Sequence, residues 1–173
     1  FGIHTTTPYE IAVIMNAQTG GEVGLIGIAL AHGLALAALG TAFAPISGGQ
    51  FNPVVTVALW LVGKVRTIEG IRCIAAQLLG AVAAGFALKL AFGGFELGDT
   101  VWSFARGGSP AVAAGLTQVT AIAIEAVLTA VLVYAVLLTA VDKRAPQLGA
   151  LLIGGVIIAD IMVGGPLTGA AMN

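Results

Sequence analysis

The chain has 173 residues, of which 58% are apolar and only 9% are charged. Soluble domains are about 45–50% apolar and about 25% charged, so this chain has too few polar side chains to cover a surface exposed to water. The formal net charge of -1 provides no basic surface for nucleic acid. These values exclude a soluble enzyme, a disordered tail and a nucleic-acid-binding protein. They indicate an all-α protein that crosses the membrane several times.

A helix needs about 20 mostly apolar residues to cross the hydrocarbon core of a bilayer. Four segments meet or approach this length, and we place them in one transmembrane domain over residues 1–173. The expected spans are residues 24–43, 71–92, 118–141 and 148–163. The last is the shortest, and we expect Gly164, Gly165 and Pro166 to end it.

A fifth apolar run, residues 53–62, is too short to cross, because about 10 residues make a helix of only about 15 Å. It is either an interfacial or buried core segment, or a re-entrant half-helix that stops midway through the membrane. Asn52 is a favoured N-cap, and Pro53 suits the first helical position because it lacks the amide that would stay unpaired there. We therefore expect residues 47–62 to form a re-entrant loop and half-helix.

The basic residues predict which side of the membrane is cytoplasmic. Five of the seven lie in two short connections, which share one side if each span crosses once and the half-helix returns. They are Lys64, Arg66, Arg72, Lys143 and Arg144. The positive-inside rule places this side in the cytoplasm. We expect residues 1–23 and the loop at 93–117 to lie outward.

Two segments of six residues have the same pattern. Residues 47–52 read SGGQFN and residues 168–173 read TGAAMN, so both run from a hydroxyl through Gly to a large apolar residue and Asn. One copy follows a span expected to run inward and the other a span expected to run outward, as in the inverted repeats of many membrane transport folds. We therefore expect residues 164–173 to begin a second re-entrant loop.

Irregular backbone at membrane depth is tolerated only where it is buried in protein or lines a water-filled cavity. We expect carbonyl groups of each loop to lead to the amide of Asn52 or Asn173 and to guide small neutral molecules in single file. The positive end of the half-helix would repel cations, including protons. The alternative is an ordinary helix start after glycines. The backbone expected along the path belongs to Gly48, Gly49, Gln50, Phe51 and Gly169.

The sequence SGGQFNPVVT at residues 47–56 resembles the first signature loop of the aquaporin, or major intrinsic protein, family, normally SGxxxNPAVT. Residues 169–173, GAAMN, are similar to the start of the second signature. Val54 replaces the usual Ala, but the role of Asn52 depends on its amide and on the helix start. The family has six spans and two half-helices. The resemblance therefore implies an aquaporin-like bundle, of which we expect this chain to be a fragment with four spans and one half-helix.

The resemblance also implies a filter of four positions near the outer mouth. Three of them fall on His32, Ile161 and Ala170, which lie twenty residues before Asn52 and twelve and three residues before Asn173. These three residues are similar to the filter of the plant vacuolar, or tonoplast intrinsic, subgroup, which passes water and in some members ammonia. For His32, the alternative is a packed histidine that forms a hydrogen bond within the bundle.

Two acidic residues lie in the expected spans. Glu125 falls where the family carries a buried Glu that braces a signature loop, and the alternative is an acid in a proton relay. Asp160 lies beside Ile161, near the outward end of its span, where it could reach water. We assign Asp160 no role.

We expect a passive channel for water, with ammonia or small uncharged solutes such as glycerol as further permeants and with protons and ions excluded. We expect no cofactor, no metal and no catalytic residue. The resemblance implies a homotetramer in a lipid bilayer, and we expect the cell membrane as its location. The alternative is a secondary transporter built from inverted repeats, for which only Glu125 is a candidate ion-coupling residue. An enzyme within the membrane would need a nucleophile with a base or an H-E-x-x-H motif, which the sequence does not offer.

Overall fold

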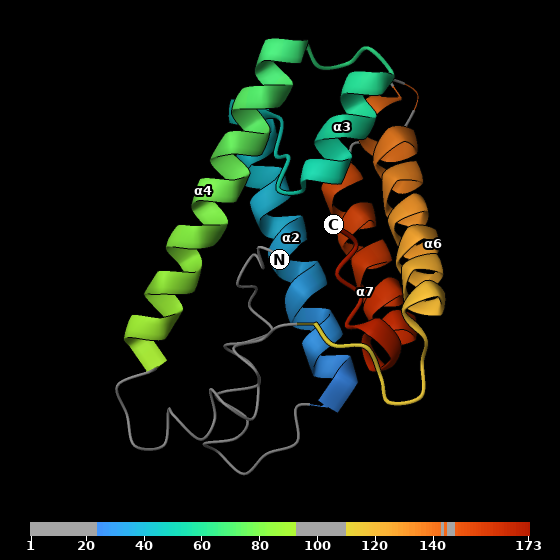
Figure 1. Ribbon diagram of the computed structural model, residues 1–173. Coiled ribbons are helices and arrows are strands. Elements are labelled where there is room, and N and C mark those ends of the chain that lie inside the picture. Colours follow the sequence, from blue (N-terminus) through green and yellow to red (C-terminus); the bar gives the residue numbers. More distant parts are fainter. Residues whose placement is uncertain (1–23, 93–109, 143, 145–147) are drawn as a thin grey trace.

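A computed structural model describes residues 24–92, 110–142, 144 and 148–173, and all the regular structure in these residues is helical (Figure 1). The expected segments at 1–23 and most of the outward loop, residues 93–109, lie outside the described residues. The helices are α2 (Gly24–Ser47), α3 (Pro53–Leu61), α4 (Thr67–Phe92), α6 (Gln118–Val136), the π-helix η2 (Leu137–Val141) and α7 (Gly149–Thr168).

Four helices within this part of the chain are long and apolar enough to cross a membrane. They are Gly24–Ser47, Thr67–Ala87, Gln118–Val141 and Gly149–Thr168. The four predicted spans are therefore confirmed in number and order, although α2 and α4 extend beyond the expected ends. The chain is an integral membrane protein with several crossings.

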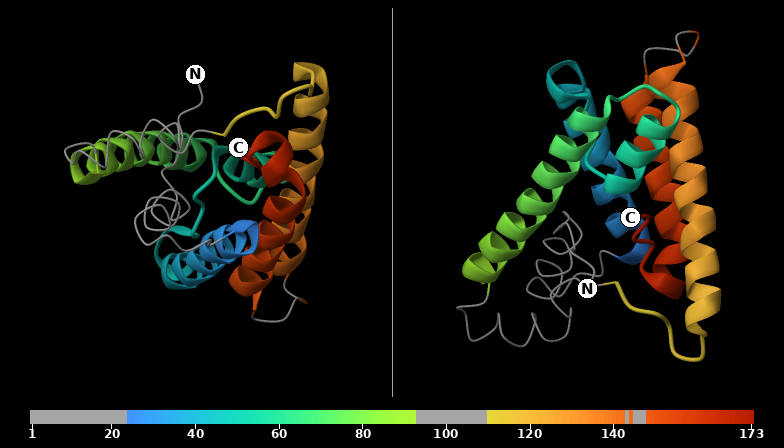
Figure 2. Two further views of the ribbon diagram at one scale, coloured as in Figure 1. Left: turned by 90° about the horizontal axis from the view of Figure 1, so that it is seen from below. Right: turned by 45° about the horizontal axis from the view of Figure 1, so that its top comes forward.

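Helices α2 and α7 pack side by side through small residues. A Cβ on Gly33 would lie 2.3 Å from the carbonyl oxygen of Gly154, and a Cβ on Gly154 would lie 2.3 Å from that of Gly33. The two backbones are therefore in direct contact, which is how membrane helices associate when no hydrophobic difference from lipid drives them. This contact joins the two repeats, and Figure 2 shows α2 and α7 adjacent in both views.

The short helix α3 has the position of a re-entrant segment. After α2 ends, the chain returns toward the middle of the bundle, and α3 then runs back to the end at which α4 begins (Figure 1). Its nine residues make a helix of about 14 Å. This is about half of the hydrocarbon thickness. The start of α3 is thereby placed near the C-terminal end of the described chain, at the middle of the bundle.

The expectation that Gly164, Gly165 and Pro166 end the last span is wrong, because α7 continues to Thr168. Gly164 serves packing instead: a Cβ there would lie 2.3 Å from Cδ1 of Leu128 on α6. The helix ends at Gly169, whose φ of 88° lies in the left-handed region that glycine adopts readily. The second loop therefore begins at Gly169 and not at residue 164.

Candidate functional site

The two repeated loops meet in the middle of the bundle. The side-chain Nδ2 of Asn52 donates a hydrogen bond of 2.6 Å to the carbonyl oxygen of Met172, which is 120 residues away in the sequence. Met172 is 3% exposed, so this contact is shielded from bulk solvent. The sequence predicted two related loops but not the bond that joins them.

Asn52 caps α3 with its side-chain oxygen. Oδ1 accepts hydrogen bonds from the backbone N–H groups of Val54 at 2.8 Å and of Val55 at 3.3 Å, and Pro53 occupies the first turn. The predicted N-cap is confirmed. These bonds fix the carboxamide so that its oxygen faces the helix and its nitrogen faces away from it. An amide nitrogen carries two hydrogens, so one remains after the bond to Met172.

The second loop follows a strained path. Ala170 and Met172 both have a φ of 49°, in the left-handed region. This region costs residues other than glycine about 1–2 kcal/mol each. Such a conformation persists only when the surroundings determine it. The loop is therefore held by contacts from elsewhere in the fold.

Glu125 on α6 supplies those contacts. Its carboxylate accepts hydrogen bonds from the backbone N–H groups of Ala171 at 3.1 Å and Met172 at 2.8 Å, and from the hydroxyl of Thr168. Hydrogen bonds to a charged acceptor are stronger than those between neutral groups. One carboxylate thereby fixes both the end of α7 and the loop that presents the Met172 carbonyl to Asn52.

The first loop is held from α4 by a residue that the sequence analysis missed. Nε2 of Gln77 donates to the carbonyl oxygen of Gln50 at 2.7 Å and to the hydroxyl of Thr56 at 3.0 Å. The carbonyl oxygen of Gln50 was expected to line the path of the permeating molecules. It accepts this one hydrogen bond from Gln77 and has a second lone pair for another donor. A polar residue between apolar neighbours in a membrane span was the signal that could have revealed Gln77.

The glycines of the first loop are required by its backbone. Gly48 and Gly49 have φ values of 82° and 62°, and a Cβ on Gly49 would lie 3.1 Å from the carbonyl oxygen of Gly40 on α2. Phe51 packs edge to face on Phe43, with ring centroids 6.1 Å apart. The loop thus turns tightly against α2 before α3 begins.

The three expected filter residues lie on neighbouring elements. Ile161 and Ala170 are each 6% exposed and belong to one buried cluster. His32 is half-buried on α2, and its Nδ1 lies 2.9 Å from the carbonyl oxygen of Ile28. His32 is next to Gly33, and the backbone of Gly33 contacts Gly154 of α7. Gly154 is about two helical turns before Ile161. Ile161 and Ala170 therefore share one buried cluster, and His32 lies on α2 beside the contact of that helix with α7.

Asp160 does not reach water as expected, because it is only 5% exposed. It lies one turn before Gly164, on the side of α7 that packs against α6. Its Oδ2 atom is buried and has no hydrogen-bond partner among the described residues.

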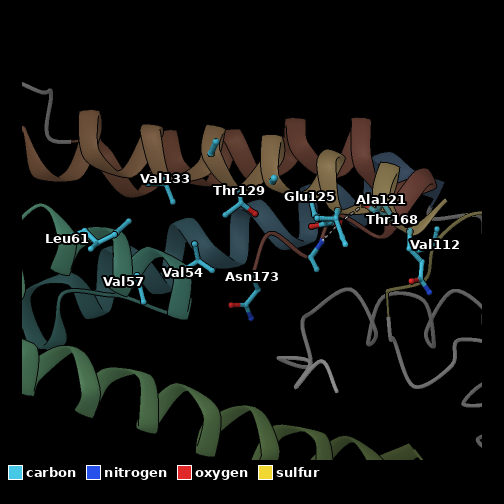
Figure 3. Close-up of a pocket in the computed structure, with 16 residues that line it drawn as sticks. Val54, Val57, Leu61, Val112, Ala121, Glu125, Thr129, Val133, Thr168 and Asn173 are labelled. Carbon is cyan, nitrogen blue, oxygen red and sulfur yellow. Dashed lines mark hydrogen bonds between the residues drawn. The ribbon is translucent and has the colours of Figure 1, made fainter. Parts of the chain in front are cut away.

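A groove of about 910 Å³ runs along α6 beside the loops. Figure 3 shows Val54 and Leu61 of α3 on one side, Thr129 and Val133 of α6 on the other, and Asn173 beyond the start of α3. Its walls are mainly apolar, and the polar residues that line it are Gln118, Glu125, Thr129, Thr168 and Asn173. Within the described residues, no three His, Cys, Asp or Glu side chains come together as a metal site.

Comparison with known proteins connects this geometry to a family. The family model described as "Major intrinsic protein" matches residues 2–173. The chain is 39% identical to aquaporin TIP2-1 of Arabidopsis thaliana over 153 residues, which are 87% of this chain and 57% of that protein. It is 35% identical to aquaporin NIP1-2 of Oryza sativa subsp. japonica over 163 residues, which are 94% of this chain and 52% of that protein.

A bacterial relative shows similar identity. Aquaporin Z of Photorhabdus laumondii is 36% identical over 129 residues, which are 72% of this chain and 54% of that protein. The chain thus spans little more than half the length of these curated relatives. The described residues form two loops that are joined by a hydrogen bond, together with the helices that hold these loops in place.

Proposed function

Because the chain belongs to the major intrinsic protein family, we propose that the full-length protein is a passive membrane channel for water. The observation that carries this proposal is the hydrogen bond from Asn52 Nδ2 to the carbonyl oxygen of Met172. It joins the two related loops at mid-bundle and fixes an amide donor at the start of a half-helix. A donor held in this way binds the oxygen of a small neutral molecule.

The single-file mechanism follows from the groups around Asn52. Its oxygen is occupied by the N–H groups that begin α3, so only its nitrogen is left to bind a permeant. A water molecule that accepts from this nitrogen turns its own hydrogens away, toward carbonyl acceptors of the loops. The positive end of α3 adds a potential that opposes a proton or another cation. Asn173 has the corresponding position in the second repeat, and we assign it the same role.

We propose that Glu125 braces the second loop. Its three donors come from the end of α7 and the loop, whereas a proton relay would need a partner acid along a path. The brace is required because Ala170 and Met172 are held in left-handed conformations. Without it, the carbonyl of Met172 would leave the position at which it meets Asn52.

His32, Ile161 and Ala170 form the outer filter in this proposal, and ammonia is a second candidate permeant on family resemblance. The Nδ1 of His32 lies 2.9 Å from the carbonyl oxygen of Ile28, so the imidazole is held against α2 and supplies the one polar side chain of the three. The apolar side chains of Ile161 and Ala170 narrow the opening without binding the solute. Glycerol is a further candidate solute on family resemblance alone.

In the cell, we propose a homotetramer with the 64–72 and 143–144 connections on the cytoplasmic side. The basic residues of these connections support that orientation. The cell membrane as the location stays a prediction.

The test is osmotic water permeability of the full-length protein in proteoliposomes, measured by light scattering. We expect permeability well above that of empty vesicles, without proton conduction and without any need for an ion gradient. Permeability equal to that of empty vesicles would contradict the channel. Uphill accumulation of a solute driven by an ion gradient would instead establish the secondary transporter.

A further inference from the structure

A small cavity lies between α3 and the first turns of α4, away from the joined loops. Its volume is about 130 Å³, and its exposed walls are apolar, formed among others by Val57, Trp60, Ile71 and Ile74. Sites that enclose a whole small-molecule ligand usually measure about 300–1,000 Å³. This cavity therefore accommodates only part of a ligand, and that part must be apolar.

The cavity lies at the level expected for the membrane–water boundary. Trp60 is 44% exposed, and its indole Nε1 donates a hydrogen bond of 3.0 Å to the hydroxyl of Thr67, the first residue of α4. Tryptophan is enriched at membrane interfaces because its ring is apolar and its N–H is polar. Helix α3 ends and α4 begins at the same end of the bundle (Figure 2, right). A ligand in the cavity would thus have one end in the apolar region and the other at the surface.

Basic residues occur in the turn that joins α3 to α4 and next to lining residues at the start of α4. Lys64 lies in the turn between the two helices, Arg66 precedes the lining residue Thr67, and Arg72 follows the lining residue Ile71. The guanidinium of Arg66 pairs with Glu69. For Lys64 and Arg72, no ion pair is formed with another described residue. Two cations are therefore available to a ligand from outside the protein.

The second connection at this end adds to the positive charge. Arg144 pairs with Asp142 and lowers the pKa of that carboxyl through their hydrogen bonds, and Lys64 lowers it further through charge. Lys64 therefore lies close enough to Asp142 to act on it electrostatically. Among the described residues, four cations and two carboxylates gather at this end of the bundle: Lys64, Arg66, Arg72, Arg144, Glu69 and Asp142.

We propose that the cavity between α3 and α4 binds an anionic phospholipid, with the start of an acyl chain among Trp60, Ile71 and Ile74 and the phosphate at Lys64 and Arg72. The apolar cavity, the interfacial tryptophan and the exposed side chains of Lys64 and Arg72 occur in the order in which a phospholipid presents its chain, its glycerol region and its headgroup. A polypeptide segment without an acidic residue in the cavity would use the apolar part and leave the two cations without partners. The proposal goes beyond water conduction and does not depend on it.

Gly70 offers a variant that changes the cavity without disturbing the helices. It lines the cavity, and a Cβ there would lie 3.7 Å from Cγ1 of Val65 and 3.9 Å from Cγ2 of Thr56, both ordinary contact distances. Gly70→Ala is therefore expected to fold and to fill part of the space. Lys64→Gln and Arg72→Gln remove the proposed phosphate contacts and leave the cavity intact.

The experiment counts bound lipid on the full-length protein by native mass spectrometry, with phosphatidylglycerol or phosphatidylcholine added to the detergent-purified protein. We expect retention of phosphatidylglycerol over phosphatidylcholine. Retention should fall about fivefold for each of the two charges removed, because a basic residue near an anionic surface contributes about 1 kcal/mol. Gly70→Ala should weaken it as well. The matched control is Lys89→Gln, which removes one charge from the last turn of the same helix α4, far from the cavity at its first turns.

Three results would overturn the lipid site. Equal retention of the two lipids would show that charge does not select the ligand. Equal losses in Arg72→Gln and Lys89→Gln would show a diffuse charge effect in place of a site. Unchanged retention in Gly70→Ala would show that another part of the protein, or a second copy, occupies the cavity. Water permeability in phosphatidylcholine vesicles is measured on the same variants, so that a failure of this site is distinguished from a failure of the channel.

Discussion

Asn52 and Met172 lie 120 residues apart in the sequence and are joined by a hydrogen bond of 2.6 Å between side-chain nitrogen and backbone carbonyl. This bond makes the geometry of each loop depend on the other. The start of α3 is fixed by the oxygen of the same amide, and the second loop by Glu125. The donor at mid-bundle is therefore positioned from both repeats at once.

Glu125→Gln and Glu125→Ala test the brace. Gln keeps the shape and can still accept from one backbone N–H, whereas Ala leaves the N–H groups of Ala171 and Met172 unpaired. Each buried donor left without a partner costs about 1–3 kcal/mol. We expect a lower melting temperature and reduced water permeability in both variants, with the larger effect in Ala. Wild-type stability of Glu125→Ala in a thermal melt would show that the loop needs no brace.

Gln77→Leu tests the support of the first loop. It removes the donor to Gln50 and Thr56, and Thr56 is completely buried. We expect a loss of about 1–2 kcal/mol in stability, together with lower water permeability, because an unpaired buried group is costly. Leu79→Ala is the matched control, since Leu79 is on the same helix and is 72% exposed. Equal losses of stability and water permeability in the two variants would show that Gln77 does not support the first loop specifically.

Gly154→Ala and Gly155→Ala test the contact between the repeats. The new Cβ at position 154 would lie 2.3 Å from the carbonyl oxygen of Gly33, whereas nothing lies within 4 Å of a Cβ at position 155. Forcing extra atoms into a packed contact costs about 1–3 kcal/mol. Thermal melts of the detergent-purified protein should show marked destabilisation for Gly154→Ala and none for its neighbour. Similar melting temperatures would mean that α2 and α7 do not pack this closely.

His32→Phe tests the proposed filter. The change replaces the polar imidazole by an apolar ring and adds bulk beside α7. We expect ammonia permeability to fall more than water permeability, because water has other donors and acceptors along the path. Both are measured in the same proteoliposomes, by a pH-sensitive dye and by light scattering. Equal loss of both permeabilities would leave His32 without a selective role.

Local patterns were sufficient to predict the spans, the cap at Asn52 and the first helical position of Pro53. Each depends on neighbouring residues, such as a run of apolar side chains or an amide before a proline. The end of α7 was mispredicted because a glycine in a membrane helix serves close packing as often as termination. Glycine is required at position 164 because Leu128 on α6 leaves no room for a side chain there. The sequence alone does not show that contact between two helices.

The contacts within the site could not be predicted from the residues alone. The bond from Asn52 to Met172 and that from Gln77 to Gln50 depend on how α2, α4 and α7 are placed. The position of Glu125 came from resemblance to a family and not from spacing. Asp160 was expected near water because it lies toward the end of its helix. It is buried because it lies on the face of α7 that packs against α6.

The water permeability of the Asn52→Leu protein in proteoliposomes decides whether the amide of Asn52 guides water, since leucine removes the amide donor at nearly the same size. Asn52→Asp is its companion, because the carboxylate keeps an oxygen that can cap α3 while losing the donor. Insertion of both variants into the membrane is checked first. We expect both variants to lose most of the water permeability. Permeability equal to that of the unmodified protein in Asn52→Leu, with protons still excluded, would contradict this role of the amide.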